Sequence, residues 1–326
     1  KLDDKGNQVD HPDEWNPEKF LDPLPISTKV RIEGQEVKIK VWKKEIEAEL
    51  TDFSIPVLFL DTNVPENEER YRNITDSLYL GDQRYRFFQE VVLGIGGFRS
   101  LKELELDPNV YHMNEDHSSL LTLELMKNNG MDPESVRRQC VFTTHTPEKS
   151  GHDTFSFDLV SDVLRDYISI SQLKKLGGMD YLNMTVLALN LSRYSNAVSK
   201  RHGVISGEMF PGREIDSITN GVHLLRWVSD RVGKVYDKYL GNWRRDPYKL
   251  RHAHRIPKYE LWEAHFEDKR DLIEFINSQK SVDMSERVFT MSFARRATPY
   301  KRANLLFTNP KRLMDIAEDK DFQIIF

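Results

Sequence analysis

The order of its predicted strands and helices constrains this chain more than any other feature. Short apolar runs typical of strands end at polar loops, and segments with helical spacing separate most of them. Strands that alternate with helices pair in parallel and are covered on both faces, so the sequence predicts an α/β fold with a parallel sheet. The runs interpreted as these strands are 56–60, 110–113, 139–144, 215–218, 288–294 and 322–326.

Helices are predicted where apolar residues recur at intervals of three and four. Glycines 94, 96 and 97 are expected to end the first helix, and Gly130 is expected to cap the second. A hairpin is predicted at 30–41, where apolar and polar residues alternate on either side of a Glu-Gly turn. The predicted helices are 84–94, 118–129, 155–170, a long buried one at 181–202, 257–277, and one from about 300 to 318.

The length of 326 residues predicts about two domains. Residues 278–287 are polar and resemble a linker, and a β-α-β pattern restarts after them. We therefore place one α/β domain at 1–282 and the start of a second at 283–326. The chain begins without Met and ends in an apolar run, so we interpret it as an internal fragment, with the first domain incomplete at its N-terminus and the second truncated.

Composition excludes several classes of protein. The formal net charge of −5 argues against a nucleic-acid partner, so any phosphate binding has to be local. Cys140 is the only cysteine, which rules out an intrachain disulfide and favours a cytoplasmic setting. No apolar run is long enough to span a bilayer, and the first residues lack the core of a signal peptide, so no membrane partner is expected.

Four cations cluster just after the predicted strand at 288–294. They are Arg295, Arg296, Lys301 and Arg302, and they surround a short turn that is predicted to open a helix. Guanidinium and ammonium groups at a helix start suit a phosphate dianion. A basic, solvated loop is the alternative that charge alone leaves open.

Polar side chains also follow the ends of three other predicted strands. Glu115 and His117 follow the strand at 110–113, His145 and Thr146 follow 139–144, and Asn220 follows 215–218. Ligands of open α/β sheets bind at the carboxyl ends of the strands, so these side chains are candidates for one ligand site.

Each cluster also has a structural reading. Glu115 and His117 could form an ion pair at a helix start, His145 could be a core histidine, and Asn220 opens an Asn-Gly turn. The spacing of the histidines and acids matches no zinc pattern, so no metal site is predicted. The sequence also contains no G-x-S-x-G elbow, and no G-x-G-x-x-G fingerprint follows a strand.

Taken together, these clusters resemble the α-glucan phosphorylases, the maltodextrin and glycogen phosphorylase family, and most of all its short bacterial and archaeal branch. The shared stretches run in family order over nearly the whole chain. They are DTNVPEN at 61–67, LGIGG at 93–97, YHMNEDH at 111–117, VFTTHTP at 141–147, GHD at 151–153, NMT at 183–185, LSRY at 191–194, SITNGVH at 217–223, FARR at 293–296 and YKR at 300–302.

The resemblance implies a two-domain fold of the glycosyltransferase-B type with the site between its domains. It implies phosphorolysis of a terminal α-1,4-linked glucose to glucose 1-phosphate, with retained configuration and with pyridoxal 5'-phosphate as cofactor. The implied partners are an α-1,4-glucan and inorganic phosphate, and a homodimer is left open.

The resemblance also implies a role for each matching residue. Arg296 and Lys301 would hold the substrate phosphate, while Arg295 and Arg302 are interpreted as structural. The remaining roles all concern the sugar: His145 at the glucosyl subsite, Asn220 on the 6-hydroxyl, and Glu115, His117, Thr146 and Tyr300 around the same pocket.

Some features depart from the family. Asp116 stands where a small residue is usual, and 148–150 reads Glu-Lys-Ser where small or apolar residues are more common. A cofactor-lysine motif similar to S-G-x-x-G-M-K does not occur, so no residue here is assigned to the cofactor and the chain alone is expected to be inactive. A sugar-nucleotide glycosyltransferase of similar architecture and a non-catalytic glucan-binding protein are the alternatives.

Overall fold

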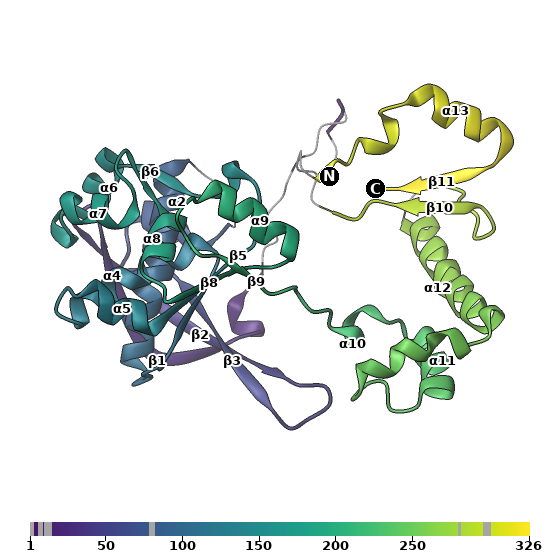
Figure 1. Ribbon diagram of the computed structural model, residues 1–326, viewed down its shortest axis with the longest axis horizontal. Coiled ribbons are helices and arrows are strands. Elements are labelled where there is room, and N and C mark those ends of the chain that lie inside the picture. Colours follow the sequence, from purple (N-terminus) through teal and green to yellow (C-terminus); the bar gives the residue numbers. More distant parts are fainter. Residues whose placement is uncertain (1–2, 6–8, 10–14, 78–81, 280–281, 296–300) are drawn as a thin grey trace. The chain divides into compact units, whose positions relative to one another are not determined.

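The computed structural model describes residues 3–5, 9, 15–77, 82–279, 282–295 and 301–326. It divides the chain into two compact units, Lys1–Asn220 and Gly221–Phe326. The two units meet at 220/221, whereas the sequence predicts a domain boundary at 282/283. Compact units need not coincide with domains, so the predicted boundary stays a prediction. The architecture is mixed α/β, as the sequence predicts (Figure 1).

A four-stranded parallel sheet lies at the centre of the first unit. Its order is β4-β5-β8-β9, and its pairs include Asn114 with Thr143 and Ala197 with Ser217. The carboxyl ends of all four strands therefore lie at one edge. The strands are β4 (Tyr111–Asn114), β5 (Cys140–Thr144), β8 (Tyr194–Ala197) and β9 (Asp216–Ser217).

An antiparallel sheet of three strands forms the opposite side of this unit. The predicted hairpin is confirmed: Glu33 and Gly34 turn the chain with positive φ angles of 55° and 83°. Alternate residues Val30, Ile32, Val37 and Ile39 are fully buried, which is the pattern of a sheet with one covered face. Its strands are β1 (Asp22–Ile32), β2 (Gln35–Glu47) and β3 (Ser54–Asp61).

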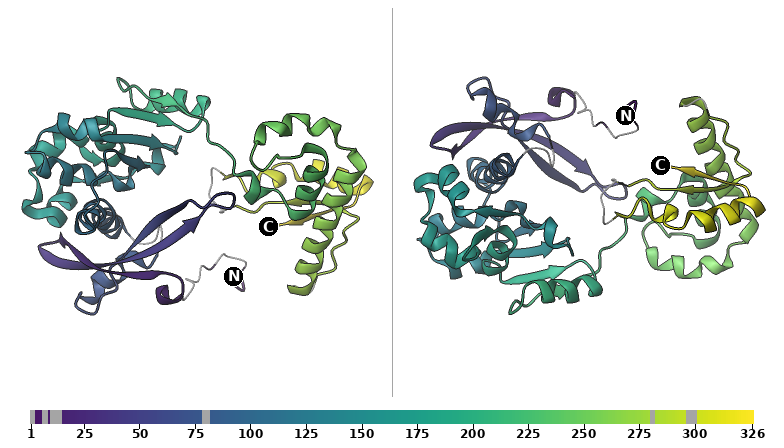
Figure 2. Two further views of the ribbon diagram at one scale, coloured as in Figure 1. Left: turned by 90° about the horizontal axis from the view of Figure 1, so that it is seen from below. Right: turned by 90° about the horizontal axis from the view of Figure 1, so that it is seen from above.

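A helix runs between the two sheets of this unit (Figure 2). It comprises α2 (Gln83–Glu90), a π-helical turn over Val91–Gly96 and α3 (Gly97–Glu103). The prediction that glycines 94, 96 and 97 end the helix is therefore wrong. Gly94 and Gly96 instead allow close packing: a Cβ on Gly94 would lie 2.9 Å from the backbone nitrogen of Leu121, and one on Gly96 would lie 2.5 Å from Cδ1 of Ile39.

The long helix predicted at 181–202 does not exist. The segment forms β7 (Tyr181–Asn183), α8 (Met184–Asn190), β8 and the start of α9 (Lys200–Met209). Asn183 and Ser199 cap the two helices by accepting hydrogen bonds from the N–H groups of Val186 and His202. The strand is buried on both faces like the helices beside it, so apolar content alone could not separate the elements.

The other elements of this unit enclose a single apolar core. Strand β6 (Thr154–Ser156) pairs with β7 in antiparallel fashion. Gly130 ends a helix with φ of 63°, as predicted. The remaining helices are α1 (Glu69–Arg72), α4 (Leu121–Asn128), α5 (Pro133–Gln139), α6 (Phe157–Leu164) and α7 (Ile170–Gly177).

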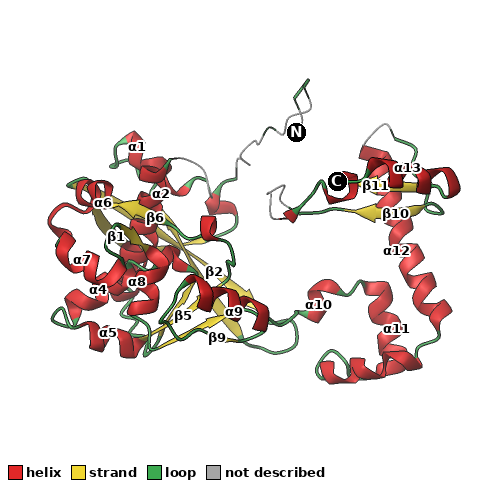
Figure 3. Cartoon of the chain, turned by 45° about the horizontal axis from the view of Figure 1, so that its top comes forward, coloured by secondary structure: helices red, strands yellow, loops and turns green. Residues whose placement is uncertain are grey.

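The second unit contains helices and one pair of parallel strands (Figure 3). Trp243 is 1% exposed and lies at the centre of its small apolar core. The helix predicted from about residue 300 begins instead at Pro310, after the N-cap Asn309. The elements are α10 (Leu224–Trp227), α11 (Asp230–Leu240), α12 (Lys258–Gln279), β10 (Phe289–Ser292), α13 (Pro310–Asp319) and β11 (Phe322–Ile325).

Within the described ranges, every helix is too short or too polar to cross a membrane.

Candidate functional site

The carboxyl edge of the parallel sheet carries four of the sequence-predicted sugar residues of the first unit, namely Glu115, His145, Thr146 and Asn220. The N–H of Glu115 donates to the carbonyl of Thr143 over 2.9 Å, which continues the β4–β5 pairing one residue beyond the strand. The N–H of Asn220 donates to the carbonyl of Val198 over 3.0 Å, which places it beyond the end of β8. His145 and Asn220 are both exposed at this edge.

Glu115 connects the loop after β4 to the loop after β5. Its Oε1 accepts hydrogen bonds from the backbone N–H of His145 and, over 2.9 Å, from the hydroxyl of Thr146. Its backbone has φ of 68°, a left-handed conformation that is unfavourable for a residue with a side chain. The second oxygen, Oε2, is buried with no hydrogen-bond partner among the described residues. An unpaired buried acceptor is costly, so a donor such as a sugar hydroxyl would be stabilising there.

The loop after β5 folds back over Thr146. Gly151 lies so close that a Cβ on it would collide with the methyl group of Thr146. Beneath this loop, His202 is 5% exposed and accepts from the N–H of Val198 through Nδ1. Burial lowers the pKa of His202 and outweighs its bond with the backbone of Thr146, so the ring is neutral at pH 7. Sequence reasoning missed His202, which it assigned to the end of a long helix.

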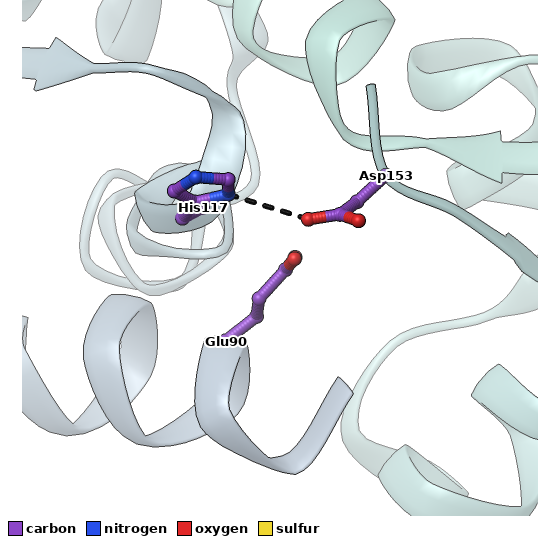
Figure 4. Close-up of side chains that lie close together, drawn as sticks. All are labelled: Glu90, His117 and Asp153. Carbon is purple, nitrogen blue, oxygen red and sulfur yellow. Dashed lines mark ion pairs between the residues drawn. The ribbon is translucent and has the colours of Figure 1, made fainter. Parts of the chain in front are cut away.

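His117 lies in a partly buried ionic cluster with Glu90 and Asp153 (Figure 4). Its Nδ1 lies 3.1 Å from Asp116 Oδ1 and 3.3 Å from Asp153 Oδ2. Arg86 donates to the same Asp153 oxygen through Nε and Nη2, over 3.0 and 2.9 Å. Glu90, which is 1% exposed, completes the cluster. The role of His117 in lining the sugar pocket stays a prediction.

Charge balance governs the protonation of this cluster. Burial by itself lowers the pKa of His117, but hydrogen bonds to Asp116 and Asp153 outweigh it and raise that pKa to about 9. Burial raises the pKa of Asp153, yet its bonds to His117, Glu90 and Arg86 bring it well below the usual range. Burial and the neighbouring carboxylates keep the pKa of Glu90 well above its ordinary value. The cluster thus pairs the ionised carboxylate of Asp153 with Arg86 and a charged His117, while Glu90 resists ionisation.

One distance in the cluster suits a different protonation state. Nη2 of Arg86 lies 2.7 Å from Nδ1 of His117, an approach expected of a neutral ring that accepts from the guanidinium. We assign the charged ring because two carboxylates face the same nitrogen and because Arg86 already has Asp153 as its acceptor.

This cluster is better suited to a guanidinium than to a metal ion. Ligand atoms of Glu90, His117 and Asp153 lie within 4.8 Å of one another, as a metal site would require. However, Arg86 already places a positive charge against Asp153 and His117, and it would repel a divalent cation.

The predicted phosphate residues belong to the second unit or lie outside the described residues. Arg296 lies outside the described residues, as does Tyr300, which is predicted to contact the sugar. Lys301 and Arg302 line a cavity of about 550 Å³ beside β10, β11 and α13. That the phosphate residues and the sugar residues form one site stays a prediction.

The place where pyridoxal phosphate binds stays a prediction, and no cavity among the described residues is assigned to it. Apart from Lys301, Arg302 and Arg312, the cavity in the second unit is lined mostly by apolar side chains such as Phe293 and Leu313. Those three cations could face an anion, whereas the apolar part of the lining offers no partner for the polar groups of a cofactor. No step of a reaction is therefore derived through this cofactor.

Comparison with known proteins confirms the family resemblance. The chain is 33% identical to the maltodextrin phosphorylase of Thermococcus litoralis, over 98% of this chain and 43% of that protein. It is 33% identical to the glycogen phosphorylase of Aquifex aeolicus, over 93% and 51% of the two chains, and 31% identical to that of Mycobacterium tuberculosis, over 82% and 37%. The chain thus spans about half the length or less of these relatives. No family model matches it.

Proposed function

We infer that this chain belongs to the α-glucan phosphorylase family and supplies the sugar-side part of a phosphorylase. Two findings support the inference: the identity to maltodextrin and glycogen phosphorylases over 82–98% of the chain, and the carboxyl edge of the parallel sheet. The proposed enzyme is a glycosyltransferase with a two-domain architecture of the glycosyltransferase-B type.

The proposed reaction is phosphorolysis of the terminal α-1,4-linked glucose of a maltodextrin or glycogen. It yields glucose 1-phosphate with retained configuration. In this proposal Arg296 and Lys301 hold the substrate phosphate, since a bidentate guanidinium and a compact ammonium suit a dianion. Tyr300 contacts the sugar.

The sugar is proposed to lie over the Glu115 edge. His145 presents its backbone carbonyl toward the charge that develops at the reacting carbon, and Asn220 binds the 6-hydroxyl. Glu115, Thr146 and His117 line the pocket. Pyridoxal 5'-phosphate would be bound mainly by residues other than those of this chain, and a homodimer remains a proposal.

The observation that carries the proposal is the arrangement of Glu115. One carboxylate oxygen fixes His145 and Thr146, and the other is a buried acceptor for which the described part of the chain supplies no donor. A site that contains an unsatisfied acceptor beside exposed His145 and Asn220 is suited to a polyhydroxylated ligand.

The test has two parts. Calorimetric titration of the 326-residue chain with maltodextrin should give saturable binding that Glu115→Gln weakens. The polypeptide that contains this chain should release glucose 1-phosphate from maltodextrin and phosphate when supplied with pyridoxal phosphate. Binding of a nucleotide sugar without phosphorolysis would replace the proposal with a glycosyltransferase, and glucan binding without turnover would replace it with a binding protein.

The chain alone is expected not to catalyse phosphorolysis, since its sequence contains no S-G-x-x-G-M-K motif. Release of glucose 1-phosphate by the purified 326-residue chain would contradict this expectation.

A further inference from the structure

Asp116 is a fully buried carboxylate in the turn that carries two of the proposed sugar-site residues. Its side chain is 0% exposed and lies between Glu115 and His117 in the sequence. A buried carboxylate is unfavourable unless it is paired and hydrogen-bonded, so its partners indicate what it does there.

One oxygen of Asp116 binds groups from two other segments, and the other oxygen faces the next residue in its own turn. Oδ2 accepts from the hydroxyl of Thr185 at the start of α8 over 2.7 Å, and from the N–H of Asp153 over 3.2 Å. Oδ1 faces Nδ1 of His117 at 3.1 Å. One carboxylate therefore joins the turn after β4 to the segment before β6 and to α8.

The contact with Thr185 continues to a second histidine. His152, 8% exposed, lies with Nδ1 2.8 Å from the Thr185 hydroxyl. Because that hydroxyl donates to Asp116, it accepts from His152, which assigns the proton to Nδ1. The direction of this chain of hydrogen bonds is thus fixed by the acceptor at its end, Asp116.

The turn held by Asp116 contains the strained residue of the site. Glu115, with φ of 68°, is anchored on one side by the β4–β5 pairing through Thr143. On its other side, the carbonyl of Asp116 accepts from the N–H and the hydroxyl of Ser119, over 2.9 and 2.6 Å. A left-handed non-glycine residue persists only where its surroundings fix it, and Asp116 provides this on the C-terminal side.

We propose that Asp116 is a positioning residue that orients His117 and holds the Glu115 turn in the conformation that binds the glucan. It acts through its neighbours and does not touch the sugar. Among the described residues, the groups that face His117 include Asp116 from its own turn, Arg86 and Glu90 from α2, and Asp153 from the loop before β6. The part that concerns glucan rests on the proposed function.

The first test is the titration of His117 by NMR of the full chain with labelled histidines, assigned with His117→Gln. In the wild type, His117 should titrate near pH 9. In Asp116→Asn it should titrate about one to three pH units lower, because one of two opposing carboxylates is removed. Asp180→Asn is the matched control, since Asp180 is exposed in the same unit. This variant should leave the titration of His117 unchanged.

The second test is the dissociation constant for maltodextrin. Asp116→Asn should raise this constant about ten-fold, because the turn loses roughly the free energy of one hydrogen bond. Thr185→Val, which removes only the hydroxyl that holds Oδ2, should also weaken binding, whereas Thr185→Ser should not. This pair keeps the proposal testable if Asp116→Asn does not fold.

The outcomes separate the two levels of inference. Wild-type His117 titrating at or below 6.5, or unchanged titration and affinity in Asp116→Asn, would overturn the role of Asp116. A wild-type chain that titrates as expected but binds no maltodextrin would instead reject the proposed function, and would leave the contact of Asp116 with His117 in place.

Discussion

The carboxylate of Glu115 accepts a hydrogen bond from the backbone N–H of His145, a residue 30 positions further along the chain and at the end of the neighbouring strand. This bond fixes the relative position of the two loops that would hold the sugar. Since Oε1 also accepts from Thr146, loss of the carboxylate affects both loops at once.

Replacing Glu115 by Gln should weaken maltodextrin binding about ten-fold, since the amide cannot accept from two donors at full strength. Calorimetric titration measures the effect. Glu208→Gln, at an exposed glutamate of α9, should leave the affinity unchanged. Equal affinities for wild type and Glu115→Gln would mean that the sugar does not bind at this edge.

Gly151→Ala should disturb Thr146, because the added methyl group needs the space of the threonine side chain. We expect weaker maltodextrin binding with a loss of unfolding free energy of about 1–3 kcal/mol. Chemical denaturation and titration of the same sample give both values. Gly207→Ala is the control: among the described residues, no atom beyond its own stretch of helix lies within 4 Å of its Cβ position, and the substitution should stabilise α9 by up to about 1 kcal/mol.

Gly94→Ala tests the packing of the π-helical turn. Its Cβ would meet backbone at the start of α4, which cannot rotate away as a side chain can. The free energy of unfolding should fall by about 2 kcal/mol or more. An unchanged urea midpoint relative to wild type would show that the turn does not pack as closely as described.

The His117 cluster should make stability fall in alkaline solution. The pKa of His117 is raised in the folded chain, so its stabilisation is complete below its ordinary pKa of 6.5 and is lost as pH rises through about 9. This shift corresponds to at most about 3 kcal/mol. The raised pKa of Glu90 acts in the same direction, because burial opposes its ionisation at high pH. Urea denaturation at pH values on either side of 9 should show a smaller decrease for His117→Gln than for wild type.

The sequence predicted three of the four strands of this edge well. Strands β4, β5 and β9 lie within the predicted runs or a residue of them, because short apolar segments between polar loops have few alternatives. Tertiary contacts decided the rest: β8 is buried between β5 and β9, so its sequence resembles the helices on either side.

The ionic cluster could not be derived from sequence alone. Arg86 and His117 are 31 residues apart, and Asp116 and Thr185 are 69 apart, so only the fold brings them together. One local signal was present and unused. Glu90 lies three residues after Phe87 on the apolar side of its helix, and an acid in such a position needs a partner.

The central position of β8 has a consequence for folding kinetics. The hydroxyl of Thr143 in β5 donates to Asn196 in β8 across 53 residues of chain, and β9 can pair only after β8 is in place. Contacts of such long sequence separation form slowly, since the chain between them must be ordered first. The part of the edge that carries Asn220 is therefore expected to form last. During refolding, the recovery of maltodextrin binding should lag behind the recovery of helix content.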